Sequence, residues 1–318
     1  MRERRHPPAP GAPCGPGHSG IEPWASVRRT RYGRFGARNP RPGRRRVIHR
    51  VLVAGALALA AVLVLAGCGA PGPSASPVRL PPLGARFDYQ LGAAYDAPTG
   101  VTVVERDRTA APARAGYDIC YVNGFQTQPA ESERFAADHP ELVLHTADGP
   151  LVDAGWPDEY LFDTSTEAKR AAVAALVGVW IRGCARHGFA AVEIDNLDSY
   201  TRAQGALTAQ DNLALAAEYA RIAHTAGLAI AQKNTADQTR RLRAAGYDFA
   251  VAESCSRFSE CDAYTDVYPA VFDIEYADEL GADAFDRACA DPTRPPSMIL
   301  RDHSLVGPDS AQYVYRSC

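Results

Sequence analysis

Positive charge is scarce in this sequence once its N-terminal region is set aside. Of the 34 lysine and arginine residues, 13 lie before Cys68, together with only two of the 37 acidic residues. The rest of the chain carries 35 acidic and 21 basic side chains, a net charge of about −14. A phosphate backbone demands a basic footprint, so nucleic acid is disfavoured as a partner. An acidic surface of this kind would steer a cationic ligand towards the protein. Solubility alone is the alternative explanation of the same negative charge.

Spacings typical of a metal site are missing as well: the chain has no Cys-x-x-Cys and no His-x-x-x-His. We therefore expect no metal and no cofactor. Six cysteines follow Cys68, and in an oxidising compartment they predict three disulfides, although they allow 15 pairings. Cys255 and Cys261 bracket a short loop and should pair most easily. The expected set is Cys255–Cys261, Cys120–Cys184 and Cys289–Cys318.

A long membrane-spanning run is also lacking. The apolar run Val51–Val64 is shorter than the ~20 residues that a spanning helix needs, although a transmembrane anchor is the alternative. Arginines precede this run and Leu65-Ala66-Gly67-Cys68 follows it, a pattern typical of a bacterial lipoprotein signal. We expect residues 1–67 to be a leader that is removed, Cys68 to be lipidated, and the protein to face outward from the cell membrane on that anchor alone. Residues 68–84 then form a Gly/Pro/Ser-rich tether, and residues 85–318 form one domain.

That domain alternates strand-like and helical patterns. One helix is expected over Ser165–His187, with Thr164 or Ser165 as its N-cap, and another over Asp211–Ala226, ending at Gly227. Strands that alternate with helices favour a parallel sheet. Their number predicts an α/β fold with a single TIM-like (β/α)8 barrel rather than an open sheet. The expected strands are Phe87–Leu91, Val101–Val104, Asp118–Val122, Tyr160–Phe162, Ala190–Ile194, Leu228–Gln232, Asp248–Val251, Ala270–Ile274 and Met298–Leu300.

Carboxylates stand at the ends of several of these strands, above all Asp195 and Glu253. The carboxyl ends of barrel strands build the active site, and two facing carboxylates are the minimum for hydrolysing a glycosidic bond. Any one acid could instead cap a loop, but acids on successive strands make that explanation poor for the whole set. Glu193 lies deeper than Asp195 on the same face and needs a partner there, such as Lys233. The residues expected to bind substrate are Glu193, Asn196, Asp198, Lys233, Asn234, Glu275 and Tyr276.

Seven blocks of sequence stand in a fixed order between roughly residues 85 and 302. They are Trp156–Leu161, Gly188–Tyr200, Ala223–Leu228, Gln232–Asn234, Phe249–Cys255, Glu260–Cys261 and Ile274–Tyr276. Together they resemble the glycoside hydrolase family 114 barrel, the endo-α-1,4-polygalactosaminidase family. The resemblance implies a TIM-like barrel that cleaves α-1,4-linked galactosamine polymers with retention, using Asp195 and Glu253 as the catalytic pair. The chain departs from the family's pattern in Phe87–Gly92, Glu105–Asp107 and Asn123–Phe125, which would shape the cleft and so leave the substrate open.

The two carboxylates need different pKa values for this chemistry. Asn196 and Lys233 are available to keep Asp195 ionised, so we assign Asp195 as nucleophile. Glu253 precedes an apolar, disulfide-closed loop whose desolvation would raise its pKa, so we assign Glu253 as acid/base; the reverse assignment stays open. Two alternatives to this function also stay open, namely a sugar-binding lipoprotein without catalysis and a glycosidase of another linkage. Asp198, Glu275 and Tyr276 are the candidates to hold amino groups and stack on sugar rings of a cationic polysaccharide.

Overall fold

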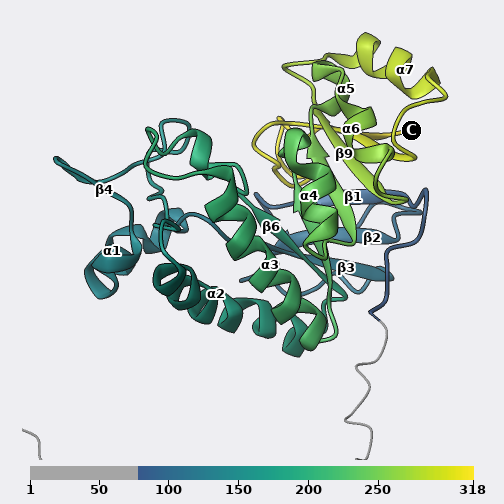
Figure 1. The fold of residues 1–318 in the computed structure, drawn as a ribbon. Coiled ribbons are helices and arrows are strands. Elements are labelled where there is room, and N and C mark those ends of the chain that lie inside the picture. Colours follow the sequence, from purple (N-terminus) through teal and green to yellow (C-terminus); the bar gives the residue numbers. More distant parts are fainter. Residues whose placement is uncertain (1–77) are drawn as a thin grey trace, which may run out of the picture. The chain divides into compact units, whose positions relative to one another are not determined.

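The computed structural model describes residues 78–318, and in it eight parallel strands hydrogen-bond to one another in sequence order. A ninth strand, β11, pairs antiparallel with β10. Figure 1 shows the sheet with its long helices packed on the outside. The strands of this sheet are β1 (Phe87–Gln90), β2 (Val103–Asp107), β3 (Tyr117–Asn123), β6 (Ala191–Asp195), β7 (Ala229–Lys233), β8 (Phe249–Glu253), β9 (Val271–Tyr276), β10 (Ser297–Arg301) and β11 (Tyr315–Ser317).

The sheet curls into a nearly closed barrel whose seam lies between β1 and β10. No ladder joins these two strands in the part of the chain that the structure describes, and side chains bridge them instead. The buried Arg301 guanidinium donates to Asp88 Oδ1 at 2.8 Å. From β11, the Tyr315 hydroxyl donates to the Phe87 carbonyl at 2.9 Å. These contacts hold the first and last strands together, so the carboxyl ends of all eight parallel strands meet at one mouth.

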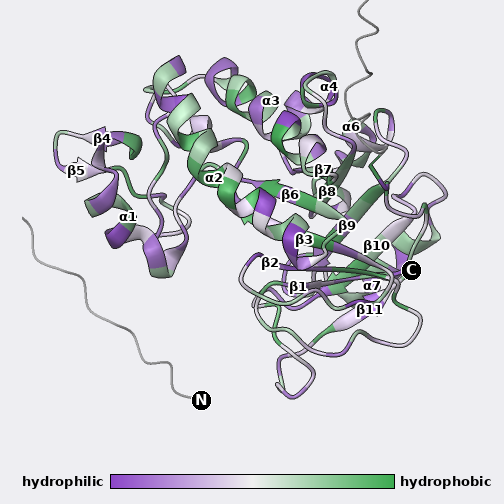
Figure 2. Ribbon diagram, turned by 90° about the horizontal axis from the view of Figure 1, so that it is seen from below, coloured by the Kyte–Doolittle hydropathy of each residue, from purple (hydrophilic) through white to green (hydrophobic). Residues whose placement is uncertain are grey.

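Two hydrophobic cores follow from the alternation of side chains along the strands. Residues such as Phe87, Ile119 and Phe249 point into the barrel. Their neighbours, such as Val192 and Ile194, point outward and pack under the helices. Figure 2 shows hydrophobic residues along the strands and mixed colours on α2 and α3, as expected for helices with one face on a sheet.

Seven α-helices and a small hairpin complete the described region. Helices α2 and α3 lie side by side along the barrel (Figure 1), whereas short or single-turn helices follow β7 and β8. The helices are α1 (Ser132–Asp138), α2 (Glu167–His187), α3 (Ala209–Thr225), α4 (Thr239–Ala244), α5 (Cys255–Phe258), α6 (Cys261–Thr265) and α7 (Ala282–Ala290). The hairpin pairs β4 (His145–Thr146) with β5 (Gly149–Pro150).

Both predicted helices are present, with shifted starts. Helix α2 is capped by Thr166, whose side chain accepts from the Lys169 amide, and not by Thr164 or Ser165. Helix α3 begins two residues earlier than predicted because Thr208 and Asp211 form a capping box. It ends at Thr225, one residue before the predicted end, and the expected Gly227 follows at φ +80°.

Three expectations about the fold need correction. Tyr160–Phe162, predicted as a strand from its apolar side chains, is not a barrel strand, because it makes only isolated bridges with loop residues around it. The short strand β11 was not predicted, because three residues carry too little pattern. Residues 78–84, expected to belong to the tether, lie against the amino ends of the strands, where the Arg79 carbonyl accepts from the Tyr117 hydroxyl at 2.7 Å.

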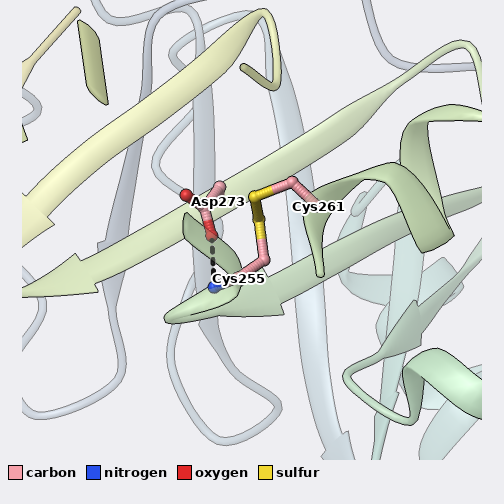
Figure 3. A group of neighbouring side chains, drawn as sticks. All are labelled: Cys255, Cys261 and Asp273. Carbon is pink, nitrogen blue, oxygen red and sulfur yellow. Dashed lines mark hydrogen bonds between the residues drawn. A yellow bond between two sulfur atoms is a disulfide. The ribbon is translucent and has the colours of Figure 1, made fainter. Parts of the chain in front are cut away.

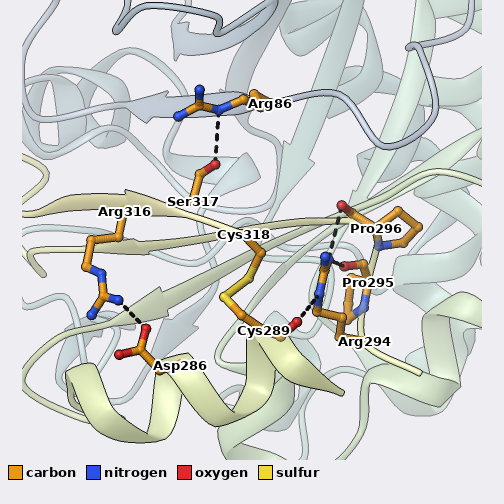
Figure 4. Close-up of a disulfide and its surroundings, with 9 residues drawn as sticks. All are labelled: Arg86, Asp286, Cys289, Arg294, Pro295, Pro296, Arg316, Ser317 and Cys318. Atoms are coloured by element: carbon orange, nitrogen blue, oxygen red, sulfur yellow. Dashed lines mark hydrogen bonds and ion pairs between the residues drawn. A yellow bond between two sulfur atoms is a disulfide. The ribbon is translucent and has the colours of Figure 1, made fainter. Parts of the chain in front are cut away.

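Three disulfides staple this domain, in the pairing expected from the sequence. Cys120–Cys184 ties β3 to α2, and Cys255–Cys261 closes the turn after β8. Cys289–Cys318 joins α7 to the chain's last residue, beside the ion pair between Arg316 and Asp286 (Figure 4).

The expected leader 1–67, the lipidation site Cys68 and the tether up to residue 77 lie outside the described residues. Within residues 78–318, no helix is both long and apolar enough to cross a membrane.

Candidate active site

A cavity of about 630 Å³ opens at the carboxyl ends of the strands. Its lining includes Asp195 and Glu253, the last residues of β6 and β8. A larger hollow of about 1020 Å³ lies on the outside, between α2 and α3, and none of its lining residues comes from a strand. The smaller cavity, called the cleft below, therefore holds the chemically equipped site. From the strand ends and following loops it receives Tyr121, Asp195, Asn196, Asp198, Lys233, Asn234, Glu253 and Tyr276.

The Asp195 carboxylate is held by hydrogen bonds to both oxygens. Its Oδ2 accepts from the Tyr121 hydroxyl at 2.8 Å. Its Oδ1 accepts from the backbone N–H of Asn196 at 2.7 Å. Asn196 has φ +62°, so the chain leaves the extended conformation immediately after Asp195. The abrupt end of β6 thus fixes the carboxylate at the mouth, where 20% of its side chain is exposed.

The Glu253 carboxylate is held even more fully. Asn234 clamps it, with Nδ2 donating to Oε2 at 3.1 Å and Oδ1 accepting from the Glu253 amide at 2.8 Å. The Tyr276 hydroxyl donates to Oε1, and Lys233 Nζ lies 3.3 Å from Oε2. Burial alone would raise the pKa of Glu253, but the Lys233 ammonium and the hydrogen bonds from Tyr276 and Asn234 outweigh it, so this pKa lies below its ordinary value. The expectation of a raised pKa was wrong, because it counted the apolar loop and not these donors.

Lys233 forms the floor of the cleft and is 2% exposed. Its ammonium donates to the Tyr89 hydroxyl at 2.8 Å and lies 3.9 Å from an oxygen of Asp195 and of Glu193. Burial would lower the pKa of Lys233, but Asp195, Glu193 and Glu253 outweigh it and raise that pKa well above normal. The distances of 3.9 Å to Asp195 Oδ1 and 3.3 Å to Glu253 Oε2 also limit the separation of these two oxygens to about 7.2 Å.

Glu193 does not line the cleft, contrary to its expected role in binding substrate. It is fully buried one layer below Asp195, and the Lys233 partner expected for it is 3.9 Å away. Its second neighbour is Glu105 of β2. Burial, and then the charge of Glu105, raise the pKa of Glu193 well above its ordinary value, and burial raises the pKa of Glu105 to about 7. Two buried carboxyls in contact need a proton between them, so this pair carries at most one negative charge near neutral pH.

Asn196 and Asp198 lie in the cleft wall as expected, but neither is free of partners. Arg202 joins them: it donates to Asn196 Oδ1 at 2.8 Å and lies 2.9 Å from Asp198 Oδ1. The same guanidinium pairs with the buried Asp153, and Asn196 donates to Asn123 Oδ1 at 3.0 Å. Asp198 remains 38% exposed, so it can still face a ligand.

Glu275 was predicted to contact substrate, and the structure places it elsewhere. Along β9, Tyr276 faces the cleft, so its neighbour Glu275 points to the opposite side, together with Asp273. There Glu275 Oε1 accepts from the backbone N–H of Ser256 at 2.8 Å, at the start of α5. Figure 3 shows Asp273 beside the Cys255–Cys261 disulfide, accepting from the Cys255 amide. The sulfur atoms of Cys255 and Cys261 are bonded to each other in this disulfide, so neither is a thiolate ligand for a metal.

Tyr276 does line the cleft. One face of its ring stacks on His303 at 4.2 Å between centroids, and its hydroxyl is engaged with Glu253. Its main contribution is therefore to hold Glu253. Four further residues line the cleft that were not predicted from the sequence, namely Tyr121, Tyr89, Arg202 and Trp156. Tyrosines inside strands look like core residues in a sequence, and Arg202 and Trp156 stand on loops without a regular pattern.

A parallel barrel whose mouth holds two such carboxylates has the arrangement that hydrolysis of a glycosidic bond requires. The sequence profile of glycoside-hydrolase family GH114 matches residues 70–318, so the chain belongs to that family. A search of curated proteins found no match.

Solved structures agree in fold. The crystal structure of Aspergillus fumigatus Ega3 in complex with galactosamine is 22% identical, covers 78% of this chain and 100% of its own, and superposes with a TM-score of 0.61. A variant of the glycoside hydrolase domain of PelA from Pseudomonas aeruginosa is 14% identical, covers 72% of this chain and 97% of its own, and has a TM-score of 0.50.

Proposed function

We propose that this protein is an exported hydrolase of α-1,4-linked galactosamine-containing polysaccharide, with Asp195 and Glu253 as its catalytic residues. The observation that carries the proposal is their convergence on one ammonium, Lys233, from two strand ends at a single cleft. Membership of family GH114 supports the reaction class. The galactosamine bound to Ega3, which shares this fold, supports the choice of sugar.

In the proposed reaction Asp195 attacks the anomeric carbon while Glu253 protonates the glycosidic oxygen. Glu253 then removes a proton from the water that releases the sugar from Asp195. The bound of about 7.2 Å between Asp195 Oδ1 and Glu253 Oε2 is compatible with a retaining mechanism and excludes only the wider part of the spacing of inverting enzymes. The choice of retention rests on the resemblance to family GH114. Glu253 is exposed over 28% of its side chain, so a bound sugar would desolvate it and favour uptake of its proton.

The charge of the cleft supports a cationic substrate. Its carboxyl groups include Asp195, Glu253, Asp153 and Asp198, against the two cations Lys233 and Arg202. A deacetylated galactosamine chain carries ammonium groups that such a site attracts. Asp198, partly exposed beside Arg202, is the carboxylate we assign to an amino group.

Export and lipid anchoring at Cys68 are part of the proposal. They rest on the Leu65–Cys68 pattern and on the three disulfides, which are typical of an oxidising compartment.

The substrate is tested by incubating the protein with four defined polymers: α-1,4-galactosaminan and glucosaminan, each deacetylated and acetylated. We expect oligomers only from galactosaminans, and more rapidly from the deacetylated form. Release from a glucosaminan alone would replace this proposal by a glycosidase of another specificity. Binding of any of them without release of oligomers would contradict the assignment of Asp195 and Glu253.

A further inference from the structure

Trp156 stands out among the exposed side chains of the described region. Six large hydrophobic side chains there are strongly exposed, and of these only Trp156 lines the cleft. Its side chain is 59% exposed. Single exposed apolar residues are common, but a tryptophan loses much hydrophobic free energy by staying in water. Its position at the edge of a cleft therefore calls for a ligand.

The Trp156 ring is not needed to hold its own loop. The backbone does this, since the Trp156 amide donates to the Asp153 carbonyl at 3.2 Å and the Trp156 carbonyl accepts from the Glu159 amide at 2.9 Å. Both flanking acids are anchored: Asp153 pairs with Arg202, and Glu159 accepts from Asn123 at 2.7 Å. The loop thus presents the indole on a fixed backbone while leaving the ring in solvent.

The chemistry of the surrounding wall indicates which ligand would occupy this place. The face of an indole ring attracts a cation more strongly than any other side-chain ring. Asp153, Asp198 and Arg202, which share this side of the cleft, carry together one net negative charge. A flat apolar face beside net negative charge matches a hexosamine ring, which has an apolar C–H face and, when deacetylated, an ammonium group.

We propose that Trp156, with Asp198, forms a distal subsite for one cationic hexosamine unit of the polymer, away from the bond that is cleaved. The proposal rests on the polysaccharide substrate proposed above. Such a subsite makes the enzyme prefer long chains, because only these reach both the catalytic pair and Trp156 at the edge of the cleft. Trp156 is here a specificity-determining residue and takes no part in bond cleavage.

The test compares Trp156→Ala with Phe258→Ala, which removes an aromatic ring that is equally exposed, at 60%, and does not line the cleft. We measure kcat/KM on deacetylated α-1,4-galactosamine oligomers of increasing length. Trp156→Ala should lose roughly 3- to 30-fold on long chains, the range of a cation–π contact, and nothing on the shortest cleaved oligomer. Phe258→Ala should match wild type at every length. An equal loss at all lengths, or no loss, would overturn the subsite.

A direct binding measurement keeps this conclusion independent of turnover. In a Trp24→Phe/Trp180→Phe/Asp195→Asn protein, Trp156 is the remaining tryptophan. Its fluorescence should change on titration with long deacetylated oligomers and respond much less to acetylated ones. Unchanged fluorescence while the oligomers bind, as measured by calorimetry, would contradict the subsite and leave the proposed function standing. Wild type that neither binds nor cleaves the polymer would contradict both.

Discussion

Lys233 is the cation that Asp195 and Glu253 share. Its ammonium lies within 4 Å of oxygens of Glu253, Asp195 and Glu193 and is closed off from solvent. The sequence marked it, as one of two lysines in the chain, and predicted contacts with Glu193 and Asp195 as well as with substrate. The structure confirms the contacts with the carboxylates, because the Lys233 side chain emerges inside the barrel below them. The contact with Glu253 was not predicted, because the spacing in sequence does not show how deep the ammonium lies.

Replacing Lys233 with Met should shift the pH profile of the enzyme as well as its rate. Without the ammonium, burial dominates and the pKa of Glu253 rises, so the limb of kcat/KM that requires protonated Glu253 moves to higher pH. In wild type this limb should lie in the acidic pH range, because the pKa of Glu253 is lowered. The rate itself should drop about 100-fold. Lys169→Met, which removes the chain's other lysine, is the control and should leave the profile unchanged. An unshifted limb in folded Lys233→Met would contradict this role.

The buried Glu105–Glu193 pair should make the protein less stable as pH rises. Both pKa values are raised in the fold, so the folded state binds more protons than the unfolded state between pH 4.5 and about 7. The contribution of this pair to the free energy of unfolding is therefore fully present below the pKa of the unfolded state. It declines as pH rises through that window. Glu105→Gln should flatten this decline, by about 1–3 kcal/mol at pH 8. Urea unfolding across pH 4–8 measures it, with the exposed Glu141→Gln as control. A decline unchanged in Glu105→Gln would show that the pair is not its source.

At the scale of elements, the sequence predicted what periodicity and chain order encode. Eight of nine expected strand runs form the parallel sheet, since a buried strand in a barrel is a short apolar run that ends at a polar turn. Tyr160–Phe162 has the same appearance but lacks a neighbour to pair with. The carboxylates at the ends of β6 and β8 were predictable for the same reason. The side of the sheet to which Glu275 points was not predictable, because it depends on where β9 ends.

The disulfides Cys289–Cys318 and Cys255–Cys261 should differ in what they contribute to stability and to catalysis. In the chain-entropy picture, opening Cys289–Cys318, which closes a loop of 29 residues, costs about 3.5 kcal/mol, and opening Cys255–Cys261, which spans six, about 2 kcal/mol. The second pair follows Glu253 directly, so its loss should reduce kcat more. Double Cys→Ser variants of each pair, compared by unfolding and by turnover, test this. A greater loss of kcat in the Cys289/Cys318 variant would contradict it.

At the scale of the whole molecule, the chain combines an acidic barrel with the lipoprotein pattern before it. The proposed lipid anchor would place a cleft that attracts cations on the outward-facing side of the cell membrane. The seam between β1 and β10, closed through Arg301 and Tyr315, was invisible in sequence because its partners lie more than 200 residues apart.

Cys68→Ala should release the protein from membranes. Cys68 is the proposed lipid attachment site, and no helix in residues 78–318 could span a bilayer. Metabolic lipid labelling followed by membrane fractionation measures this, with Cys14→Ala as a matched cysteine replacement. Lipid incorporation that persists in Cys68→Ala would place the anchor elsewhere.

The central claim is that Asp195 and Glu253 together cleave an aminosugar polymer. The most direct measurement is turnover of deacetylated α-1,4-galactosaminan by wild type, Asp195→Asn and Glu253→Gln, each confirmed as folded by its unfolding transition. These near-isosteric changes keep the hydrogen-bonding shape and remove the charge and the exchangeable proton. We expect wild type to release oligomers and each variant to lose activity on the order of 10³-fold. Cleavage by Glu253→Gln or Asp195→Asn at the wild-type rate would contradict it.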